Sequence, residues 1–134
     1  MTKVPNTALV LERDLFFVVK IRETLTSAGY TVSVAKTADD LRARLAADTP
    51  LPAIVLVHFG VPQVEWQAAI AATVAMGVPV LAYGQHVDIA GQQAARAAGA
   101  TRVIANSKLS ADLPGQVERT IARQPTPQEE AADD

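Results

Sequence analysis

Acidic, basic and imidazole side chains follow two of the apolar runs in this sequence, at positions where they could bind an ion or carry a proton. Glu12 and Arg13 come directly after the run at 7–11, and His58 follows the run at 53–57. Glu12 is expected to bond Arg13 or His58, and a Glu–His contact would raise the basicity of the imidazole through the nearby opposite charge. Imidazole titrates near neutrality and can act as a nucleophile, so His58 is a candidate pH switch or phosphoryl acceptor.

The sequence contains little evidence for a metal site or a nucleotide-binding site. The chain contains no cysteine, which excludes disulfides, thiolate metal ligands and a cysteine nucleophile. His58 and His86 with one glutamate could in principle bind Zn²⁺, but no tight ligand spacing favours a zinc site. No G-x-G-x-x-G or Walker pattern occurs, so nucleotide binding has no motif. We therefore expect no cofactor and no resident metal.

Charge is distributed unevenly along the chain. The formal net charge is −2, and no base follows Arg123, whereas four acids do: Glu129, Glu130, Asp133 and Asp134. The remaining bases form no Lys/Arg run, so nothing indicates binding to nucleic acid or to an anionic membrane. Residues 124–134 also carry two prolines and no large apolar residue, which predicts a disordered acidic tail after a single domain at 1–123.

Hydropathy along the chain favours a protein of the cytoplasm. No apolar stretch approaches the roughly 20 residues of a membrane-spanning helix, and no secretion signal is visible at the start. The 134 residues suffice for one hydrophobic core. Because the composition is 49% hydrophobic but only 4% aromatic, that core must consist mainly of aliphatic side chains.

The pattern of apolar residues predicts five alternating strand and helix units. Strands are expected at 7–11, 30–34, 53–57, 78–83 and 101–105, because these short runs are apolar or β-branched. Helices are expected between and after them, the third over 62–76, with Asp14 and Asp88 as N-caps and Gly29 and Gly99 at helix ends. The last is marked by Leu113, Val117 and Ile121.

Strict alternation with short connections predicts an α/β fold with a parallel sheet. Right-handed crossovers return each helix across the sheet, which gives a flavodoxin-like (βα)5 doubly wound parallel sheet, with strand order 2-1-3-4-5. In such sheets the functional groups collect at the carboxyl ends of the strands. Glu12, Arg13 and His58 are expected at those ends.

Three segments resemble one known family, the response-regulator receiver domain. Residues 8–14 look like the family's first strand and its acidic cluster, and residues 54–62 look like its third strand and the turn after the phosphoacceptor. Residues 97–103 are similar to the Ala-Gly-Ala turn before the fifth strand. The resemblance covers residues 7 to 123 and implies the same flavodoxin-like fold.

The resemblance also implies an altered metal and phosphoacceptor site. In the family, two acids hold Mg²⁺ and an aspartate attacks phosphorus. Here the acid pair falls on Glu12 and Arg13, and the phosphoacceptor falls on His58. A cation stands where a ligand belongs, and imidazole is softer than the carboxylate oxygen that Mg²⁺ prefers. Metal-assisted aspartyl phosphorylation should therefore fail.

The phosphoryl-binding residues implied by the family are replaced as well. The family's hydroxyl falls on Gly84 and its lysine falls on Asn106. Lys108 lies two residues later, so a register shift could restore a cation to the pocket, although not the aspartate. Lys108 is therefore kept with Asn106 as a member of the degenerate pocket.

The preferred hypothesis is a phosphorylation-independent pseudo-receiver, a non-enzymatic signalling module. It would act through a protein partner of a two-component pathway or as a homodimer. The resemblance implies an interface on the fourth helix, fifth strand and last helix, which would include Arg96, Arg102 and Arg119.

Two alternatives remain open at this point. One is a small ligand-binding, anion-binding or enzymatic flavodoxin-like domain that uses Glu12, Arg13 and His58, with His86 nearby. It requires an open polar pocket, and closure of the site by Phe59 and Tyr83 would argue against it. The other is a phosphohistidine-type receiver on His58.

Overall fold

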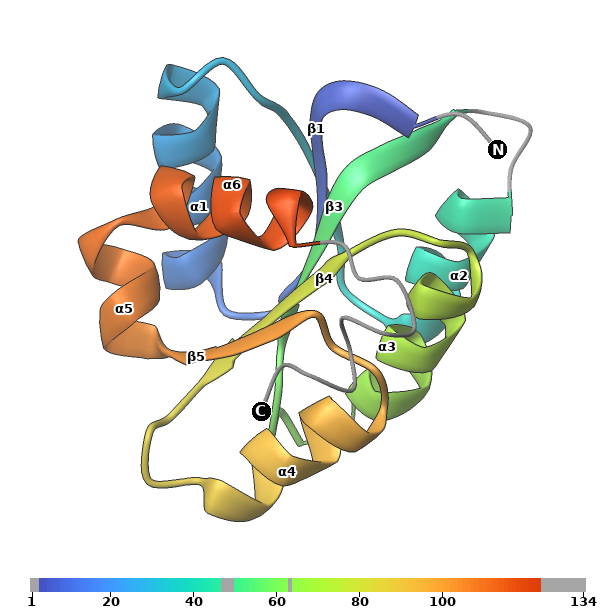
Figure 1. The fold of residues 1–134 in the computed structure, drawn as a ribbon, viewed down its shortest axis with the longest axis vertical. Coiled ribbons are helices and arrows are strands. Elements are labelled where there is room, and N and C mark those ends of the chain that lie inside the picture. Colours follow the sequence, from blue (N-terminus) through green and yellow to red (C-terminus); the bar gives the residue numbers. More distant parts are fainter. Residues whose placement is uncertain (1–2, 47–49, 63, 124–134) are drawn as a thin grey trace.

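A single parallel sheet forms the centre of the protein (Figure 1). The computed structural model describes residues 3–46, 50–62 and 64–123, so the predicted tail at 124–134 lies outside the described residues. The strand order is β2-β1-β3-β4-β5, and every pairing is parallel. The strands are β1 Lys3–Leu11, β2 Thr31–Ala35, β3 Leu51–His58, β4 Val80–Gly84 and β5 Arg102–Ala105. The predicted fold class and strand order are confirmed.

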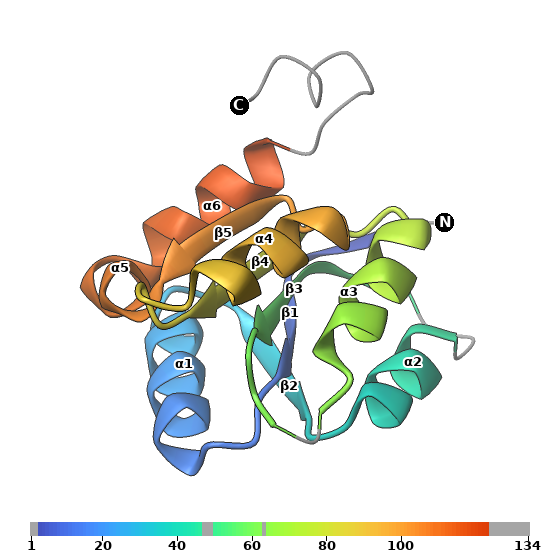
Figure 2. The ribbon, with the colours of Figure 1, turned by 90° about the horizontal axis from the view of Figure 1, so that it is seen from below.

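Helices cover both faces of this sheet (Figure 2). They are α1 Leu15–Ser27, α2 Ala38–Ala46, α3 Trp66–Ala75, α4 Ile89–Ala97, α5 Asn106–Ala111 and α6 Leu113–Ala122. Side chains of α2, α3 and α4 share one core cluster, and side chains of α1, α5 and α6 share the other. No helix in this described part of the chain is long and apolar enough to cross a membrane.

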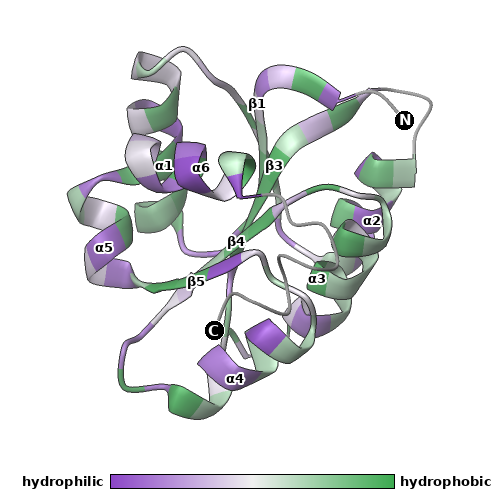
Figure 3. Cartoon of the chain, viewed as in Figure 1, coloured by the Kyte–Doolittle hydropathy of each residue, from purple (hydrophilic) through white to green (hydrophobic). Residues whose placement is uncertain are grey.

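The central strands are buried on both faces, which explains their continuous apolar runs. Along β3, Ile54 and Leu56 pack toward α1 and α6, while Val55 and Val57 pack toward α2 and α3. All four side chains are fully buried. Figure 3 shows hydrophobic colour along β3 and hydrophilic segments on α4, α5 and α6.

The two predicted N-cap residues form capping hydrogen bonds in the structure. The carboxylate of Asp14 accepts from the backbone N–H of Phe16 at 2.9 Å, and that of Asp88 accepts from Gly91 at 2.9 Å. These caps satisfy N–H groups that have no partner within the helix. Gly99 follows α4 with a φ of +108°, a conformation that glycine adopts without strain.

The largest differences from the sequence prediction concern the start of β1, the start of α3 and an additional helix. β1 begins at Lys3 rather than at residue 7, because Lys3 and Val4 pair with the start of β3 before an irregularity at Asn6, whose φ is +59°. α3 begins only at Trp66, after a turn that contains Pro62. A short helix, α5, separates β5 from the predicted last helix and was not expected.

Candidate functional site

Three neighbouring strands bring one carboxylate, one imidazole and one phenol together. Glu12 directly follows β1, His58 is the last residue of β3, and Tyr83 lies in β4. In the sheet register His58 is the direct partner of Tyr83. Because the strands are parallel, these positions meet at the carboxyl edge of the sheet, where α/β proteins place their functional groups.

The carboxylate of Glu12 is buried and fully engaged by donors. Its side chain is 1% exposed. Oε1 accepts from the Tyr83 hydroxyl at 2.6 Å and lies 2.9 Å from His58 Nδ1. Oε2 accepts from the backbone N–H groups of Arg13 at 3.0 Å and Asp14 at 3.1 Å. A buried charge is stable only when it is paired and hydrogen-bonded, and this one is both.

The contact with Glu12 fixes the orientation of the His58 ring. An ionised carboxylate only accepts hydrogen bonds, so His58 Nδ1 carries a proton in this contact, and Nε2 lies outside the bond. The ring stacks on Tyr83, with a centroid separation of 4.9 Å and an interplanar angle of 19°, and its edge meets Phe17 at 5.1 Å. The side chain of His58 remains 15% exposed, so the imidazole closes the site from the solvent side.

Electrostatics favour the ionised form of Glu12. Burial alone would raise the pKa of this carboxyl, but hydrogen bonds from His58, Tyr83 and the Asp14 backbone, with the charge of His58, outweigh it and lower the pKa. Burial raises the pKa of Tyr83 well above its ordinary value, and the adjacent charge of Glu12 raises it further. Tyr83 is therefore a neutral donor to a charged acceptor.

The aromatic ring of Phe59 fills the space beside Gly84. Phe59 is 2% exposed and packs against Trp66, with ring centroids 6.1 Å apart. A Cβ atom at position 84 would overlap the Phe59 ring, and one at Gly91 would meet both this ring and Asp88. The Phe59 ring therefore leaves no room for a side chain at position 84.

The remaining residues of the predicted pocket lie apart from this network. The side chain of Arg13 is exposed, and among the described contacts only its backbone N–H reaches Glu12. Asn106 begins α5 directly after β5, and its Oδ1 is buried without a partner in the described residues. Lys108 is exposed in the last turn of α5. Of the two, Asn106 lies closer to the strand end.

The described residues do not fit a divalent metal. The four donors on Glu12 occupy the oxygens that a cation would need, and the donors beside them are N–H and O–H groups. Within residues 3–46, 50–62 and 64–123, no group of three His, Cys, Asp or Glu side chains could hold a metal ion. His86 is exposed in the loop after β4, where its carbonyl accepts from Gln92.

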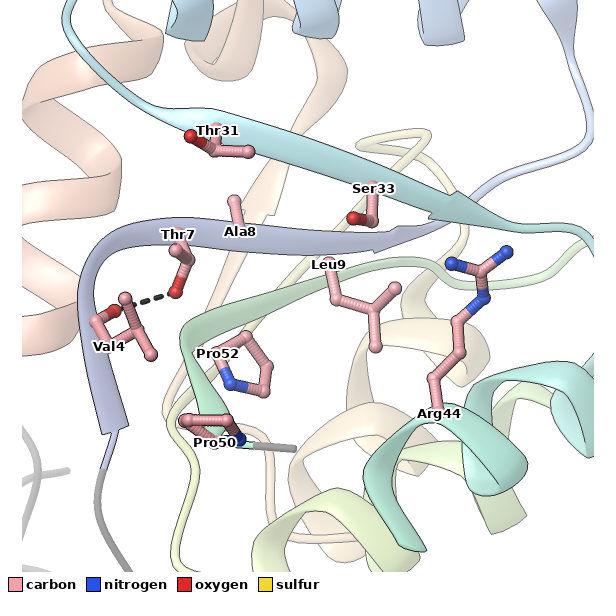
Figure 4. A pocket seen from close by; sticks show the side chains of 9 residues that line it. All are labelled: Val4, Thr7, Ala8, Leu9, Thr31, Ser33, Arg44, Pro50 and Pro52. Atoms are coloured by element: carbon pink, nitrogen blue, oxygen red, sulfur yellow. Dashed lines mark hydrogen bonds between the residues drawn. The ribbon is translucent and has the colours of Figure 1, made fainter. Parts of the chain in front are cut away.

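An open cavity of about 300 Å³ lies elsewhere, against the early part of β1 and β2 (Figure 4). Its lining is mainly apolar and hydroxylic and comprises Val4, Thr7, Ala8, Leu9, Thr31, Ser33, Arg44, Pro50 and Pro52. The Thr7 hydroxyl is already bonded to Val4 and Ala53, and Arg44 pairs with Asp40 at 3.2 Å. The predicted site residues do not line this cavity.

The predicted interface residues lie around the edge strand β5. Arg96 is exposed in the last turn of α4, and Arg119 is exposed in the last turn of α6. Arg102 begins β5 and donates to Gln116 Oε1 at 2.9 Å. Arg119 forms an ion pair with Asp112 at 3.5 Å.

Sequence reasoning placed Glu12 and His58 correctly at one sheet edge but missed two of their partners. It considered Tyr83 only as a residue that could close the site, whereas the Tyr83 hydroxyl donates to Glu12 and the ring of Phe17 contacts His58. One available signal was the position of Tyr83 at the end of an otherwise aliphatic strand, since a buried phenol requires an acceptor.

Comparison with known proteins supports the fold. No family model and no curated protein matches this sequence. The fold is similar to a CheY-like response-regulator receiver domain from Methanospirillum hungatei, with a TM-score of 0.75, 18% identity and coverage of 92% of this chain and 97% of that one. A receiver domain from Clostridium thermocellum gives 0.74 at 16% identity, covering 88% and 95%.

One similar structure carries a phosphorylated side chain. It is a response regulator from Burkholderia pseudomallei with a phosphorylated aspartic acid, a calcium ion and citrate, and it has a TM-score of 0.73 at 17% identity. The similarity covers 87% of this chain and 69% of that one. At these identities the likeness establishes the fold, and the chemistry must be argued from the side chains.

Proposed function

We propose that this protein is a receiver-like signalling module whose conformation is not controlled by phosphorylation. It acts without enzymatic activity, by binding a protein partner of a two-component pathway or a second copy of itself in the cytoplasm. The fold shared with receiver domains supports a signalling role. The site at the strand ends supports independence from phosphate.

The observation that carries the proposal is the engagement of the Glu12 carboxylate. In a metal-dependent receiver this position must present free oxygens to Mg²⁺, whereas here Tyr83, His58 and two backbone N–H groups already bind them. Binding Mg²⁺ would require breaking these bonds and placing the cation beside Arg13. The loss of buried hydrogen bonds opposes that exchange.

The ring of Phe59 is a second, independent obstacle to binding a phosphoryl group at the strand ends. Its ring occupies the space beside Gly84 where a phosphoryl group would need a hydroxyl donor. The same closure argues against the alternative of a small-molecule or anion site built on Glu12, Arg13 and His58. The strand end is closed by these contacts, which suits a scaffold that binds proteins through the face carrying Arg96, Arg102 and Arg119.

Treatment with acetyl phosphate or with beryllofluoride, each with Mg²⁺, tests the proposal. Intact mass reports phosphorylation, and the fluorescence of Trp66, the sole tryptophan, reports the pocket because its ring packs on Phe59. We expect neither signal to change. A fluorescence change that saturates with beryllofluoride and requires Mg²⁺ would overturn the proposal.

A second candidate, phosphorylation of the histidine itself, is favoured by one observation. The bond from Nδ1 to Glu12 leaves His58 Nε2 outside the contact, with a carboxylate that stabilises the imidazolium. The same mass measurement separates the candidates. A gain of one phosphoryl group that persists in His86→Ala and is lost in His58→Ala would support the histidine and overturn phosphate independence.

A further inference from the structure

An apolar patch is exposed on the first half of α1, which forms an outer edge of the molecule (Figure 2). Six large apolar side chains are exposed in the described residues, and three of them, Leu15, Phe16 and Val19, lie in this stretch. Their exposed fractions are 71%, 68% and 45%. Single exposed apolar residues are ordinary, but contiguous ones mark an interaction site. We call Leu15, Phe16 and Val19 the α1 patch.

Packing on the inner side of α1 holds the patch in place. The ring of Phe17 turns inward and contacts His58, with ring centroids 5.1 Å apart. The ring of Phe16 is exposed and meets the ring of Phe17 edge to face at 5.7 Å. Ile21 and Leu25 of the same helix are fully buried. One side of α1 is therefore fixed to the core, and the other side presents the patch to the exterior.

The hollow at the patch suits a helix better than a small molecule. It is open, measures about 660 Å³, and within the described residues its lining comes from α1 alone: Leu15, Phe16, Val19, Lys20, Glu23 and Thr24. A small-molecule site encloses most of its ligand, which one helix surface cannot do. Rows of side chains spaced by four residues, such as Leu15, Val19 and Glu23, can instead pack against another helix.

The charges on either side of the patch repeat the same order, a base and then an acid. Arg13 and Asp14 precede the patch, and Arg22 and Glu23 follow it. All four are exposed, and none has an ion-pair partner among the residues that the structure describes. A parallel pair of α1 helices would therefore place like charges opposite each other.

An antiparallel pair of α1 helices brings opposite charges together instead. Arg13 and Glu23 lie equally far along the chain from Val18, one on each side. Asp14 and Arg22 are also equally far from Val18. A two-fold axis level with Val18 therefore places Arg13 opposite Glu23 of the second copy. The same axis places Asp14 opposite Arg22, so this surface is complementary to itself.

We propose that the occupant of the α1 patch is a second copy of this chain, and that two α1 helices pack antiparallel in a two-fold dimer. The apolar side chains of both copies lie at the centre, and the ion pairs at both ends set the register. Lys20 of one copy lies opposite Phe16 of the other, where its ammonium group can rest on the ring. The interface uses none of Arg96, Arg102 and Arg119, so the dimer leaves them for a partner protein.

Sedimentation equilibrium of the full-length protein between about 10 µM and 1 mM tests for the dimer, because small interfaces are weak. We expect the wild type to form a dimer in this range. Leu15→Gln/Phe16→Gln removes the central contact and should weaken the dimer at least about tenfold. Both side chains are more than two-thirds exposed, so the variant should still fold. The matched control Val87→Gln/Ile89→Gln replaces apolar side chains that are 67% and 56% exposed outside α1, and it should leave the dimer unchanged.

Charge reversals test the antiparallel register. Arg13→Glu and Glu23→Arg each place like charges at both ends of the dimer, and each should weaken it at least about tenfold. In a mixture of these two variants, opposite charges face each other at both ends of the mixed dimer. The mixture should therefore recover the wild-type affinity to within about threefold. The double variant Arg13→Glu/Glu23→Arg should recover its own dimer for the same reason.

Three results would overturn the proposal. A wild type that stays monomeric up to about 1 mM would leave the patch to a different protein. A dimer that survives Leu15→Gln/Phe16→Gln, or that the Val87→Gln/Ile89→Gln control disrupts, would lie on another face. Charge reversals that have no effect, or that the mixture does not rescue, would contradict the antiparallel register. The response to acetyl phosphate and beryllofluoride is measured separately, so a monomeric protein that ignores phosphate would remove the dimer and leave the proposed function.

Discussion

The chemistry of the site depends on which groups surround Glu12. The residue type matches a metal ligand, but a carboxylate responds to its neighbours, and here those neighbours are donors. The sequence alone could suggest a Glu12–His58 contact, because both residues follow parallel strands. It could not assign Tyr83 as a donor, since that contact joins residues 71 positions apart and depends on side-chain rotamers.

Replacing Glu12 tests whether the carboxylate stabilises the closed site. Glu12→Gln keeps the shape but removes the charge, and we expect a loss of about 2–4 kcal/mol in the free energy of unfolding at neutral pH. Because the folded protein lowers the pKa of Glu12, this stabilisation is present above the unfolded carboxyl pKa, about 4.3, and is lost as pH falls through the folded value.

Urea unfolding between pH 3 and pH 7 measures this difference. The difference in the free energy of unfolding between the wild type and Glu12→Gln should decrease as pH falls. Glu23→Gln, an exposed carboxyl on α1, serves as the matched control and should shift stability by no more than about 0.5 kcal/mol. A difference in free energy that stays constant with pH would show that folding does not lower the pKa of Glu12.

Removing the Tyr83 hydroxyl should weaken the hydrogen-bond network around Glu12 by deleting one of its donors. Tyr83→Phe is expected to cost about 1–3 kcal/mol at neutral pH, because a buried charged acceptor loses its donor. The folded protein raises the pKa of Tyr83, so the wild type is stable below the unfolded tyrosine pKa, about 10, and loses stability as pH rises beyond it.

The measurement is unfolding of the two proteins at pH 8 to pH 11. The free energy of unfolding of the wild type should exceed that of Tyr83→Phe at pH 8, and this difference should disappear as pH rises through about 10. Burial and then the charge of Glu118 also raise the pKa of Tyr30, but Tyr30 titrates in both proteins and cancels in the comparison. An advantage that survives at high pH would contradict the assignment of Tyr83 as a buried neutral donor.

At the scale of elements, most of the fold was predictable and the exceptions share a cause. Apolar runs, helix caps and terminal glycines are local signals, and they predicted all five strands and the starts of α1 and α4. The extension of β1 to Lys3 was missed because it depends on pairing with Leu51 and Pro52, which are remote in sequence. The helix α5 was missed because Asn106 and Ser107 are weak helix formers.

The contact between the β3–α3 turn and the end of β4 yields a prediction at this scale. Gly84→Ser should destabilise the protein by about 1–3 kcal/mol, because its side chain would overlap the Phe59 ring. In a Phe59→Ala background the same serine should cost less, with a coupling energy of at least about 1 kcal/mol. Denaturant unfolding of the four proteins in this cycle measures the coupling, and additive effects would contradict the close packing.

At the scale of the whole molecule, the pattern of apolar residues accounts for the fold, whereas the side chains at the strand ends decide the chemistry. Solved structures at 16–18% identity share this fold over 88–92% of the chain, so few identical residues are needed to specify the architecture. The resemblance to receiver domains implied that Arg13, His58 and Gly84 are unsuited to Mg²⁺ or phosphate, and this stays a prediction. The sequence could not predict how the strand ends are packed, because that depends on contacts of the Phe59 and Tyr83 side chains.

The last prediction concerns whether the strand ends can bind a metal when carboxylates replace Arg13 and His58. Arg13→Asp with His58→Asp places two new carboxylates beside Glu12, and their mutual repulsion should destabilise the protein in EDTA. Mg²⁺ binds only the folded site, so it should stabilise this variant by about 2.7 kcal/mol at a concentration of 100 Kd. The thermal stability of the wild type should depend on Mg²⁺ only through ionic strength.

Thermal unfolding of both proteins in EDTA, in Mg²⁺ and in NaCl of equal ionic strength measures this difference. A wild type that Mg²⁺ alone stabilises would contradict the closed site, whereas a metal-dependent double variant would show that two side chains separate the closed pocket from a metal-binding one.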